Sequence, residues 1–163
     1  MIGFGPAGMF AALILAEAGY RPIVAERGAP VEERTGSVES FWKTGVLDTE
    51  SNVQFGEGGA GTFSDGKLNT GTKDPRAGFV LREFAAAGAP EEILWEAKPH
   101  IGTDRLPQAV KGIRKKILSL GGEIRFHTRV TDLMIRSGAV CGAVLNGDER
   151  LETDTVILAV GHS

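Results

Sequence analysis

The sequence Gly3-Phe4-Gly5-Pro6-Ala7-Gly8 follows directly on Met1-Ile2 and has the spacing Gly-x-Gly-x-x-Gly. In a turn between a strand and a helix, the first glycine permits the sharp bend and the second lets a dinucleotide pyrophosphate approach the backbone. The third glycine lets the helix pack closely against the strand. The pyrophosphate of the ligand would lie at the helix N-terminus, where free N–H groups favour an anion. We therefore predict a dinucleotide site at Gly3, Gly5, Pro6, Ala7 and Gly8.

The segments that follow the turn support this prediction. The apolar residues 9–18 predict a helix that ends at Gly19, and residues 22–26 predict a short buried strand. This strand ends at Glu26, roughly 20 residues beyond the turn, where an acidic side chain can accept hydrogen bonds from ribose hydroxyls. The alternative is an exposed strand-end carboxylate. Arg27 would favour a 2′-phosphate, but Glu26 would repel one, so we assign Glu26 and Arg27 to the ribose end of a cofactor without that phosphate.

The composition is that of a globular domain with an apolar core. The chain has 163 residues, 42% of them hydrophobic and 24% charged, and its formal net charge is −3. It has no basic block of the kind that binds nucleic acid, and no apolar stretch of the roughly 20 residues that a membrane-spanning helix needs. The single cysteine, Cys141, excludes a cysteine-pair redox centre within the chain and fits a reducing, cytoplasmic setting. The histidines lack metal-ligand spacing, so we predict no metal site.

Helices and then strands are expected after residue 30. Residues 31–45 predict a helix with Val31, Val38, Phe41 and Trp42 as apolar anchors. Further helices are expected in residues 74–88, after Pro90, and in residues 103–121. Later segments predict strands, namely residues 123–127, 130–136, 139–145 and 155–160. Ser137-Gly138 and Asn146-Gly147 are hairpin turns in this scheme. The last strand, nearly all apolar, is expected to be buried on both faces of a parallel sheet.

A glycine-rich stretch in the middle of the chain, residues 55–68, has no helix or strand period. Gly61 and Gly66-Lys67 have the spacing of a phosphate loop, but Leu68 stands where a Ser or Thr would bind Mg²⁺, so we reject a nucleotide-triphosphatase. Small residues let backbone N–H groups approach a flat ligand closely. We therefore predict that Gly58, Gly59, Gly61 and Thr62 lie against the cofactor. The alternative is a surface loop whose Asp65 and Lys67 are solvated.

The end of the chain carries two further candidates. Gly161 follows the last predicted strand, and ligands of open α/β sheets bind beyond the carboxyl ends of their strands. Gly161 would let the backbone pass the cofactor closely, and His162 would contact the cofactor or simply cap the strand. The expected fold is α/β, with a Rossmann-type parallel sheet and a small antiparallel meander formed by residues 1–30 and 122–163. Residues 31–121 are expected to form a helical and glycine-rich insertion.

Three segments together resemble the bacterial FAD-dependent (NAD(FAD)-utilising) dehydrogenases of the glutathione-reductase type. These segments are residues 3–28, 55–68 and 159–163. The resemblance implies that Gly3, Gly5 and Gly8 bind the FAD pyrophosphate, that Glu26 binds the adenosine ribose, and that the backbone of Val130 faces the adenine. It also places the glycine-rich stretch near the isoalloxazine or ribityl chain. Members of the family have a full first strand and a substrate domain, so we expect this chain to be an incomplete FAD-binding domain, truncated at both ends and inactive alone.

The function expected from these features is that of the FAD-binding portion of a flavin-dependent oxidoreductase. FAD would carry the hydride or electron transfer, with a small-molecule substrate and with NAD(P)H as a candidate electron donor. We assign no catalytic side chain. One alternative is a nicotinamide-only dehydrogenase with a Tyr-x-x-x-Lys pair, but the only tyrosine, Tyr20, has Val24 at the lysine position. The other alternative is a non-catalytic nucleotide- or FAD-binding module.

Overall fold

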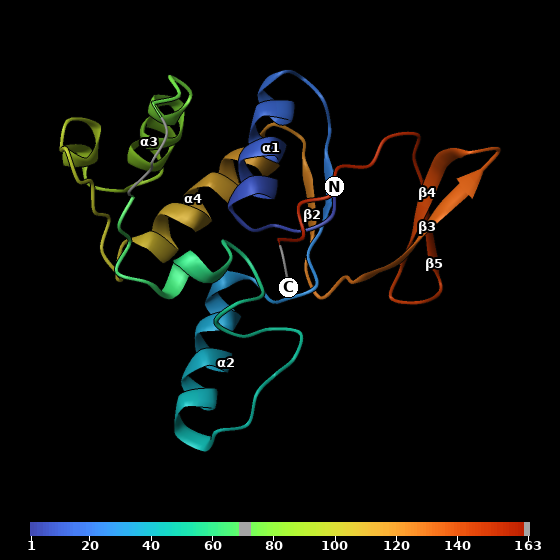
Figure 1. Ribbon diagram of the computed structural model, residues 1–163, viewed down its shortest axis with the longest axis horizontal. Coiled ribbons are helices and arrows are strands. Elements are labelled where there is room, and N and C mark those ends of the chain that lie inside the picture. Colours follow the sequence, from blue (N-terminus) through green and yellow to red (C-terminus); the bar gives the residue numbers. More distant parts are fainter. Residues whose placement is uncertain (69–72, 162–163) are drawn as a thin grey trace.

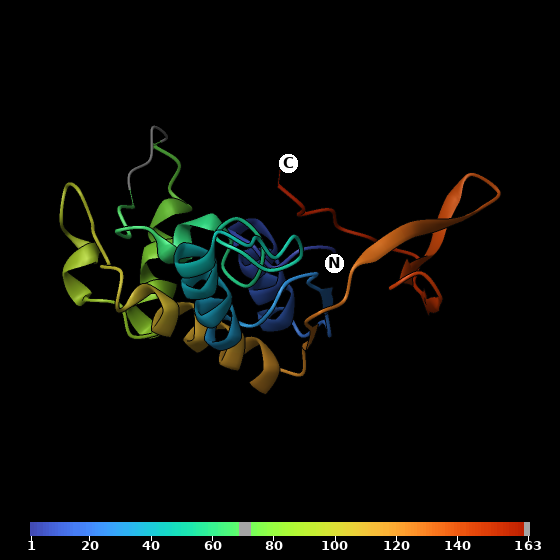
Figure 2. The same ribbon diagram turned by 90° about the horizontal axis from the view of Figure 1, so that it is seen from below.

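The structure, a computed structural model, describes residues 1–68 and 73–161. The helices lie on one side of a small parallel sheet, and a three-stranded antiparallel sheet projects on the other side (Figures 1 and 2). Its elements confirm the α/β fold class. The prediction that concerns His162 lies outside the described residues.

The parallel sheet forms around the start of the chain. β1 (Ile23–Ala25) pairs in parallel with β2 (Glu123–Arg125), and Ile2 makes parallel bridges to Ala25 on one side and to Leu158 on the other. The N–H of Ala25 donates to the carbonyl of Met1 at 2.9 Å, and the N–H of Ala159 donates to that of Ile2 at 2.8 Å. Ile2 therefore occupies the central position of a parallel arrangement, as in a Rossmann sheet.

The predicted burial of residues 155–160 on both faces is wrong. Ile157, Leu158 and Val160 are 38%, 63% and 58% exposed. The segment does not form the predicted strand: it pairs only through an isolated bridge between Leu158 and Ile2, and within the described part of the chain no strand lies beside its other edge. A run of apolar residues predicts an extended strand, whereas its burial depends on what packs over it.

Two helices form most of the core. α1 (Pro6–Glu17) and α4 (Leu106–Ser119) pack against each other beside the sheet, as Figure 1 shows. α4 is amphipathic, and its buried residues lie near helical spacing. α1 ends as predicted, because Gly19 has a φ of 84° that only glycine adopts readily. The buried residues of the two helices are Gly8, Met9, Ala12, Leu13, Ala16, Leu106, Ala109, Val110, Ile113 and Ile117.

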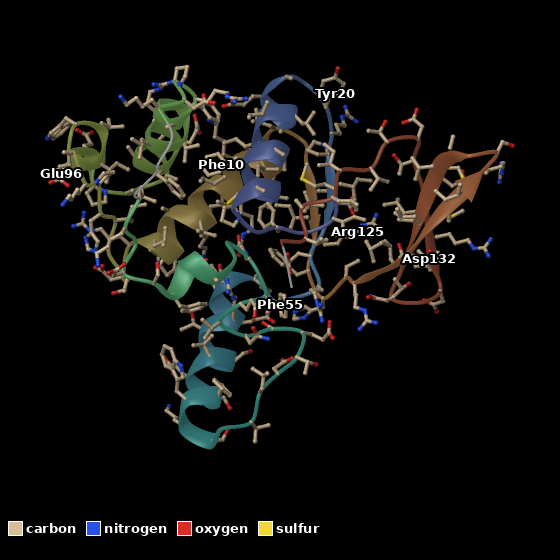
Figure 3. All side chains as sticks on the ribbon, viewed as in Figure 1. Phe10, Tyr20, Phe55, Glu96, Arg125 and Asp132 are labelled. Carbon is tan, nitrogen blue, oxygen red and sulfur yellow. The ribbon has the colours of Figure 1, made fainter. Side chains whose placement is uncertain are left out.

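The remaining helices extend the body on either side. α2 (Val31–Thr44) ends at Gly45 in a left-handed conformation, and α3 (Ala77–Ala86) packs near α4. The aromatic ring of Phe10, labelled in Figure 3, meets those of Phe79 and Phe84 edge-on. A 3₁₀ turn, Glu91–Leu94, follows Pro90 where a short helix was expected. Trp42 is not an anchor of α2, because it is 66% exposed.

The antiparallel sheet matches its prediction closely. β3 (Val130–Arg136), β4 (Ala139–Leu145) and β5 (Glu149–Glu152) form a meander in that order. Both turns have two consecutive residues with positive φ, which is the geometry of type I′ hairpins. The turn residues are Ser137, Gly138, Asn146 and Gly147.

Residues 46–68, called the middle loop below, connect α2 to the segment before α3. They are irregular apart from one 3₁₀ turn, Ala60–Phe63, as the lack of periodicity predicts. No helix in the described residues is long and apolar enough to cross a membrane.

Candidate functional site

A cavity of about 450 Å³ lies at the carboxyl ends of the parallel strands. In open α/β sheets this edge is where ligands bind. Most of the predicted site residues line the cavity, namely Gly3, Gly5, Pro6, Ala7, Glu26, Arg27, Gly59, Val130 and Gly161. The lining also includes residues that were not predicted: Ile2, Ala25, Gln54, Phe55, Gly56, Ala60, Thr128, Arg129, Ala159 and Val160.

The glycine turn (Gly3–Gly8) packs as tightly as its spacing implies. Gly3 has a φ of 98°, and a Cβ atom there would lie 2.5 Å from the carbonyl oxygen of Ala159. A Cβ atom on Gly8 would lie 2.0 Å from the carbonyl oxygen of Gly3. Gly8 therefore supports the turn from behind and does not line the cavity, whereas Gly5 faces it.

The first turn of α1 offers a hydrogen-bond donor at the cavity. The helix begins at Pro6, which has no N–H, and the N–H of Met9 makes a hydrogen bond of 2.9 Å to the carbonyl of Gly5. The N–H group of Ala7, which lines the cavity, precedes that bond, so it has no intrahelical acceptor. Together with the helix dipole, this donor makes this end of the cavity favourable for an anion.

Glu26 is buried and is anchored by backbone N–H groups. Its Oε2 accepts a hydrogen bond from the Phe4 N–H at 2.7 Å, and its Oε1 accepts one from the Gly28 N–H at 2.8 Å. With 5% exposure it is not the exposed carboxylate of the alternative interpretation. Each carboxylate oxygen can accept a second hydrogen bond, so Glu26 connects the glycine turn to β1 and still presents acceptors at the cavity.

The middle loop contributes fewer of its predicted residues than expected. Gly59 lines the cavity, but Gly58 and Thr62 are buried inside the loop, where the Thr62 hydroxyl donates to the carbonyl of Glu57 at 3.2 Å. Gly61 is exposed, and a Cβ atom there would meet nothing within 4 Å. The parts of the loop that do face the cavity are Gln54, Phe55, Gly56, Gly59 and Ala60.

A buried arginine that was not predicted fixes this loop. Arg34 of α2 is fully buried, and its guanidinium donates to the carbonyls of Asn52, Val53 and Glu57 at 2.8, 2.6 and 2.5 Å. It also lies over the Phe63 ring, 4.9 Å from the centroid. Burial lowers the pKa of Arg34 to about 10, against the charges of nearby glutamates. Arg34 follows Val31 at helical spacing. A charged residue on this apolar helix face was the sequence signal that could have indicated its burial.

Glu57 is the second buried charge of the loop. Its Oε2 accepts hydrogen bonds from the Val31 N–H at 2.7 Å and from Arg114 Nη1 at 3.0 Å. Its Oε1 is buried and has no hydrogen-bond partner in the described structure. Burial raises the pKa of this carboxyl, and the Val31 N–H and Arg114 oppose the rise. Standing between two glycines, Glu57 gives no sequence signal of its burial.

An ionic cluster lies where the middle loop approaches the strand ends. Arg27 donates from Nε and Nη2 to the two carboxylate oxygens of Glu50, both at 3.0 Å. Arg129 Nη1 lies 3.5 Å from the same carboxylate. The Arg27 guanidinium stacks over the ring of Phe55, 4.7 Å from its centroid; Figure 3 labels Phe55 close to the first turn of α2.

Cys141, considered above as a reactive group, lies away from the cavity. Cys141 is partly buried in β4, where its Sγ lies 3.4 Å from the carbonyl oxygen of Met134, and it does not line the cavity. Among the residues that the structure describes, no three His, Cys, Asp or Glu side chains come together in a way that could bind a metal ion.

Comparison with known proteins finds similarity in sequence and similarity in fold. No family model matches it. An uncharacterised protein of Clostridium beijerinckii is 54% identical over all 163 residues, and the chain spans 30% of the length of that relative.

Three solved structures have a similar fold. The halogenase PltM has a TM-score of 0.59 at 14% identity, over 99% of this chain and 34% of the halogenase. THI4 of Thermovibrio ammonificans has a TM-score of 0.53 at 19% identity, over 89% of this chain and 45% of THI4. The Diels-Alderase PyrE3 has a TM-score of 0.51 at 17% identity, over 93% of this chain and 29% of the Diels-Alderase. At these identities the likeness shows the fold alone, a Rossmann-type α/β domain with an antiparallel meander.

Proposed function

We propose that the cavity binds FAD and that the chain is the FAD-binding part of a flavin-dependent oxidoreductase. The observation that supports this most strongly is the convergence of the glycine turn, the first turn of α1, Glu26 and the ends of the parallel strands on one cavity. Residues 1–30 and 122–163 form the nucleotide-binding core in this proposal, and residues 31–121 form the insertion that supplies the middle loop.

Each part of the cavity has a role in the proposal. The backbone of Gly5 and Ala7 binds the pyrophosphate, and Glu26 accepts hydrogen bonds from the adenosine ribose. The backbone of Val130 faces the adenine. Gly59 and Gly161 flank the flavin side, where both allow a close approach of backbone to a planar ring.

The residues present fit a dinucleotide. A volume of about 450 Å³ lies in the usual range of small-molecule sites, roughly 300–1,000 Å³. The cavity has a donor at the helix N-terminus and two arginines, while the carboxylate of Glu26 is already stabilised by two N–H groups. An anionic ligand with ribose hydroxyls complements this distribution of charge and acceptors. The flavin would carry the hydride or electron transfer, and the protein binds and orients it.

The proposal also covers the activity of the whole protein. The resemblance of residues 3–28, 55–68 and 159–163 to bacterial FAD-dependent dehydrogenases of the glutathione-reductase type favours a dehydrogenase or reductase acting on a small-molecule substrate. NAD(P)H is the candidate electron donor. We assign no catalytic side chain to the described residues.

The test is flavin binding by the purified full-length protein. We expect the absorption bands of oxidised flavin and release of FAD, not FMN, on denaturation. Gly5 has ordinary φ, and a Cβ atom there meets only the Cα of Gly59, at 4.0 Å, so Gly5→Val fills the site without backbone strain. This variant should lose FAD while keeping the melting temperature of the wild type without ligand. A colourless wild type that FAD neither stabilises nor binds in a titration would refute the proposal.

A further inference from the structure

The roles proposed above use only the positive charge of Arg27 and Arg129 and leave Glu50, which contacts both, without a role. Both arginines line the cavity, and Glu50 bridges them from the middle loop. Their positions in the chain place them at one end of the cavity, because Arg27 follows Glu26 and Arg129 precedes Val130. In the proposed function, this is the end that takes the adenosine half of the cofactor.

The bridge fixes the orientation of the Arg27 guanidinium. Glu50 accepts two hydrogen bonds from it in a bidentate arrangement, and the ring of Phe55 supports one of its faces at 4.7 Å. The carbonyl of Thr49 accepts a third hydrogen bond from Nη2 at 3.3 Å. A guanidinium fixed in this way presents a preorganised planar surface and loses little conformational freedom when a ligand binds.

Glu50 also compensates the charge of the pair. Two guanidiniums beside one cavity repel each other, and the Glu50 carboxylate lies within 3.5 Å of a nitrogen of each. Arg129 is more exposed than Arg27, with 57% of its side chain accessible against 36%, so it depends more on the bridge for its position. As a result, two planar, positively charged guanidinium groups lie at the edge of the cavity, and such groups suit a flat, electron-rich ring such as adenine.

We propose that Glu50 is a positioning residue and that Arg129, with Arg27, selects ligands carrying an adenosine half. This inference rests on the proposed function. It assigns a reason for FAD to be preferred over FMN: FMN has the flavin and one phosphate but lacks the adenosine that would occupy this end of the cavity. It also predicts that ADP, which has only the adenosine and pyrophosphate half, competes for the same contacts.

ADP and FMN, which correspond to the two halves of FAD, distinguish a role in adenosine binding from a merely structural role. Dissociation constants of FAD, ADP and FMN are measured for the wild-type full-length protein and for Glu50→Gln and Arg129→Gln. Each variant should bind FAD and ADP about tenfold more weakly, the loss expected for one contact made by a charged group, while FMN affinity stays the same. Glu39→Gln and Arg136→Gln are matched controls outside the cavity, and they should leave all three constants unchanged.

The outcomes distinguish this inference from the proposed function. If the wild type binds FAD but Glu50→Gln and Arg129→Gln weaken FAD and FMN equally, or leave FAD unchanged, the inference is wrong and the proposed function stands. Tighter FAD binding by Glu50→Gln would also overturn it, because Glu50 would then oppose the ligand. If the wild type binds no flavin, both fail.

Discussion

The glycine turn and the middle loop border the same cavity, but different forces fix them. The glycine turn is fixed by backbone packing: a Cβ atom on Gly3 or Gly8 would collide with a neighbouring carbonyl oxygen. The middle loop is fixed by charged side chains that reach it from two helices, Arg34 of α2 and Arg114 of α4. One wall thus depends on the absence of side chains, and the other depends on buried charges.

This difference determines how each wall responds to change. The glycine turn packs through backbone atoms and not through side-chain partners that could be removed, so damage to it requires added bulk. A buried charge stabilises only while all its partners are present, and removing it leaves unsatisfied groups in a medium where they cost much. We therefore expect the middle loop to be the more vulnerable wall.

The largest effect is expected from Arg34→Met. It leaves the carbonyls of Asn52, Val53 and Glu57 without their donor, and the loss of a buried charged partner destabilises by roughly 3–5 kcal/mol. Urea unfolding of the full-length protein measures this change. Arg34→Lys should recover part of it, because lysine keeps the charge but not the fork that reaches three carbonyls. Arg82→Met, on an exposed position of α3, is the control. Equal stability of the Arg34 and Arg82 variants would mean that the loop does not depend on this guanidinium.

A smaller effect is expected from Gly8→Ala in the other wall. The new methyl group would lie 2.0 Å from the Gly3 carbonyl oxygen, so α1 must shift away from the turn. Overpacking of this kind typically costs about 1–3 kcal/mol. Gly36→Ala in α2 is the matched control: its Cβ meets nothing within 4 Å, and alanine in a helix stabilises by roughly 0.5–1 kcal/mol. The two alanine variants should therefore change the unfolding free energy in opposite directions, and a shared direction would contradict the packing argument.

The same difference explains what the sequence could predict. The glycine turn, the stop at Gly19 and the two hairpin turns were predictable, because each depends on the backbone freedom of residues next to one another in the chain. Glu57 was not, because its burial is created by Val31 and Arg114, which are remote in sequence. The exposure of Trp42 and of residues 155–160 was missed for a related reason, since an apolar side chain does not specify whether anything packs on it. Within the cavity, sequence spacing found the residues at strand ends but could not show which glycines of the middle loop face inward.

The pH dependence of stability tests the charged wall without adding or removing bulk. Burial raises the pKa of Glu57 above its ordinary value of 4.5, so the folded state binds its proton more tightly than the unfolded state does. The free energy of unfolding should therefore decrease as the pH rises from 4.5 through the raised pKa. Arg114, Arg34 and Glu32 are the charges around the group. In Glu57→Gln this decrease should be absent, so its stability relative to the wild type should increase with pH. Parallel stability curves for the two proteins would show that the burial of Glu57 carries no such penalty.

The smallest effect is expected at Gly61, and it separates the two kinds of glycine in the middle loop. Gly59 has a φ of 67° and lines the cavity, and a Cβ atom on it would lie 2.9 Å from Cδ of Pro6, at the start of α1. Gly61 has no positive φ, is exposed, and has open space around its Cβ position. Gly61→Ala should therefore leave both stability and FAD affinity unchanged within about 0.5 kcal/mol, as for most surface substitutions. Gly59→Ala should weaken FAD binding, because the added methyl group pushes the loop away from the glycine turn at the point where the two walls meet.

If both variants weaken FAD binding to the same extent, the ligand contacts more of the middle loop than the residues that line the cavity. If neither does, the middle loop borders the cavity without binding the cofactor, and the glycine turn and strand ends bind it alone.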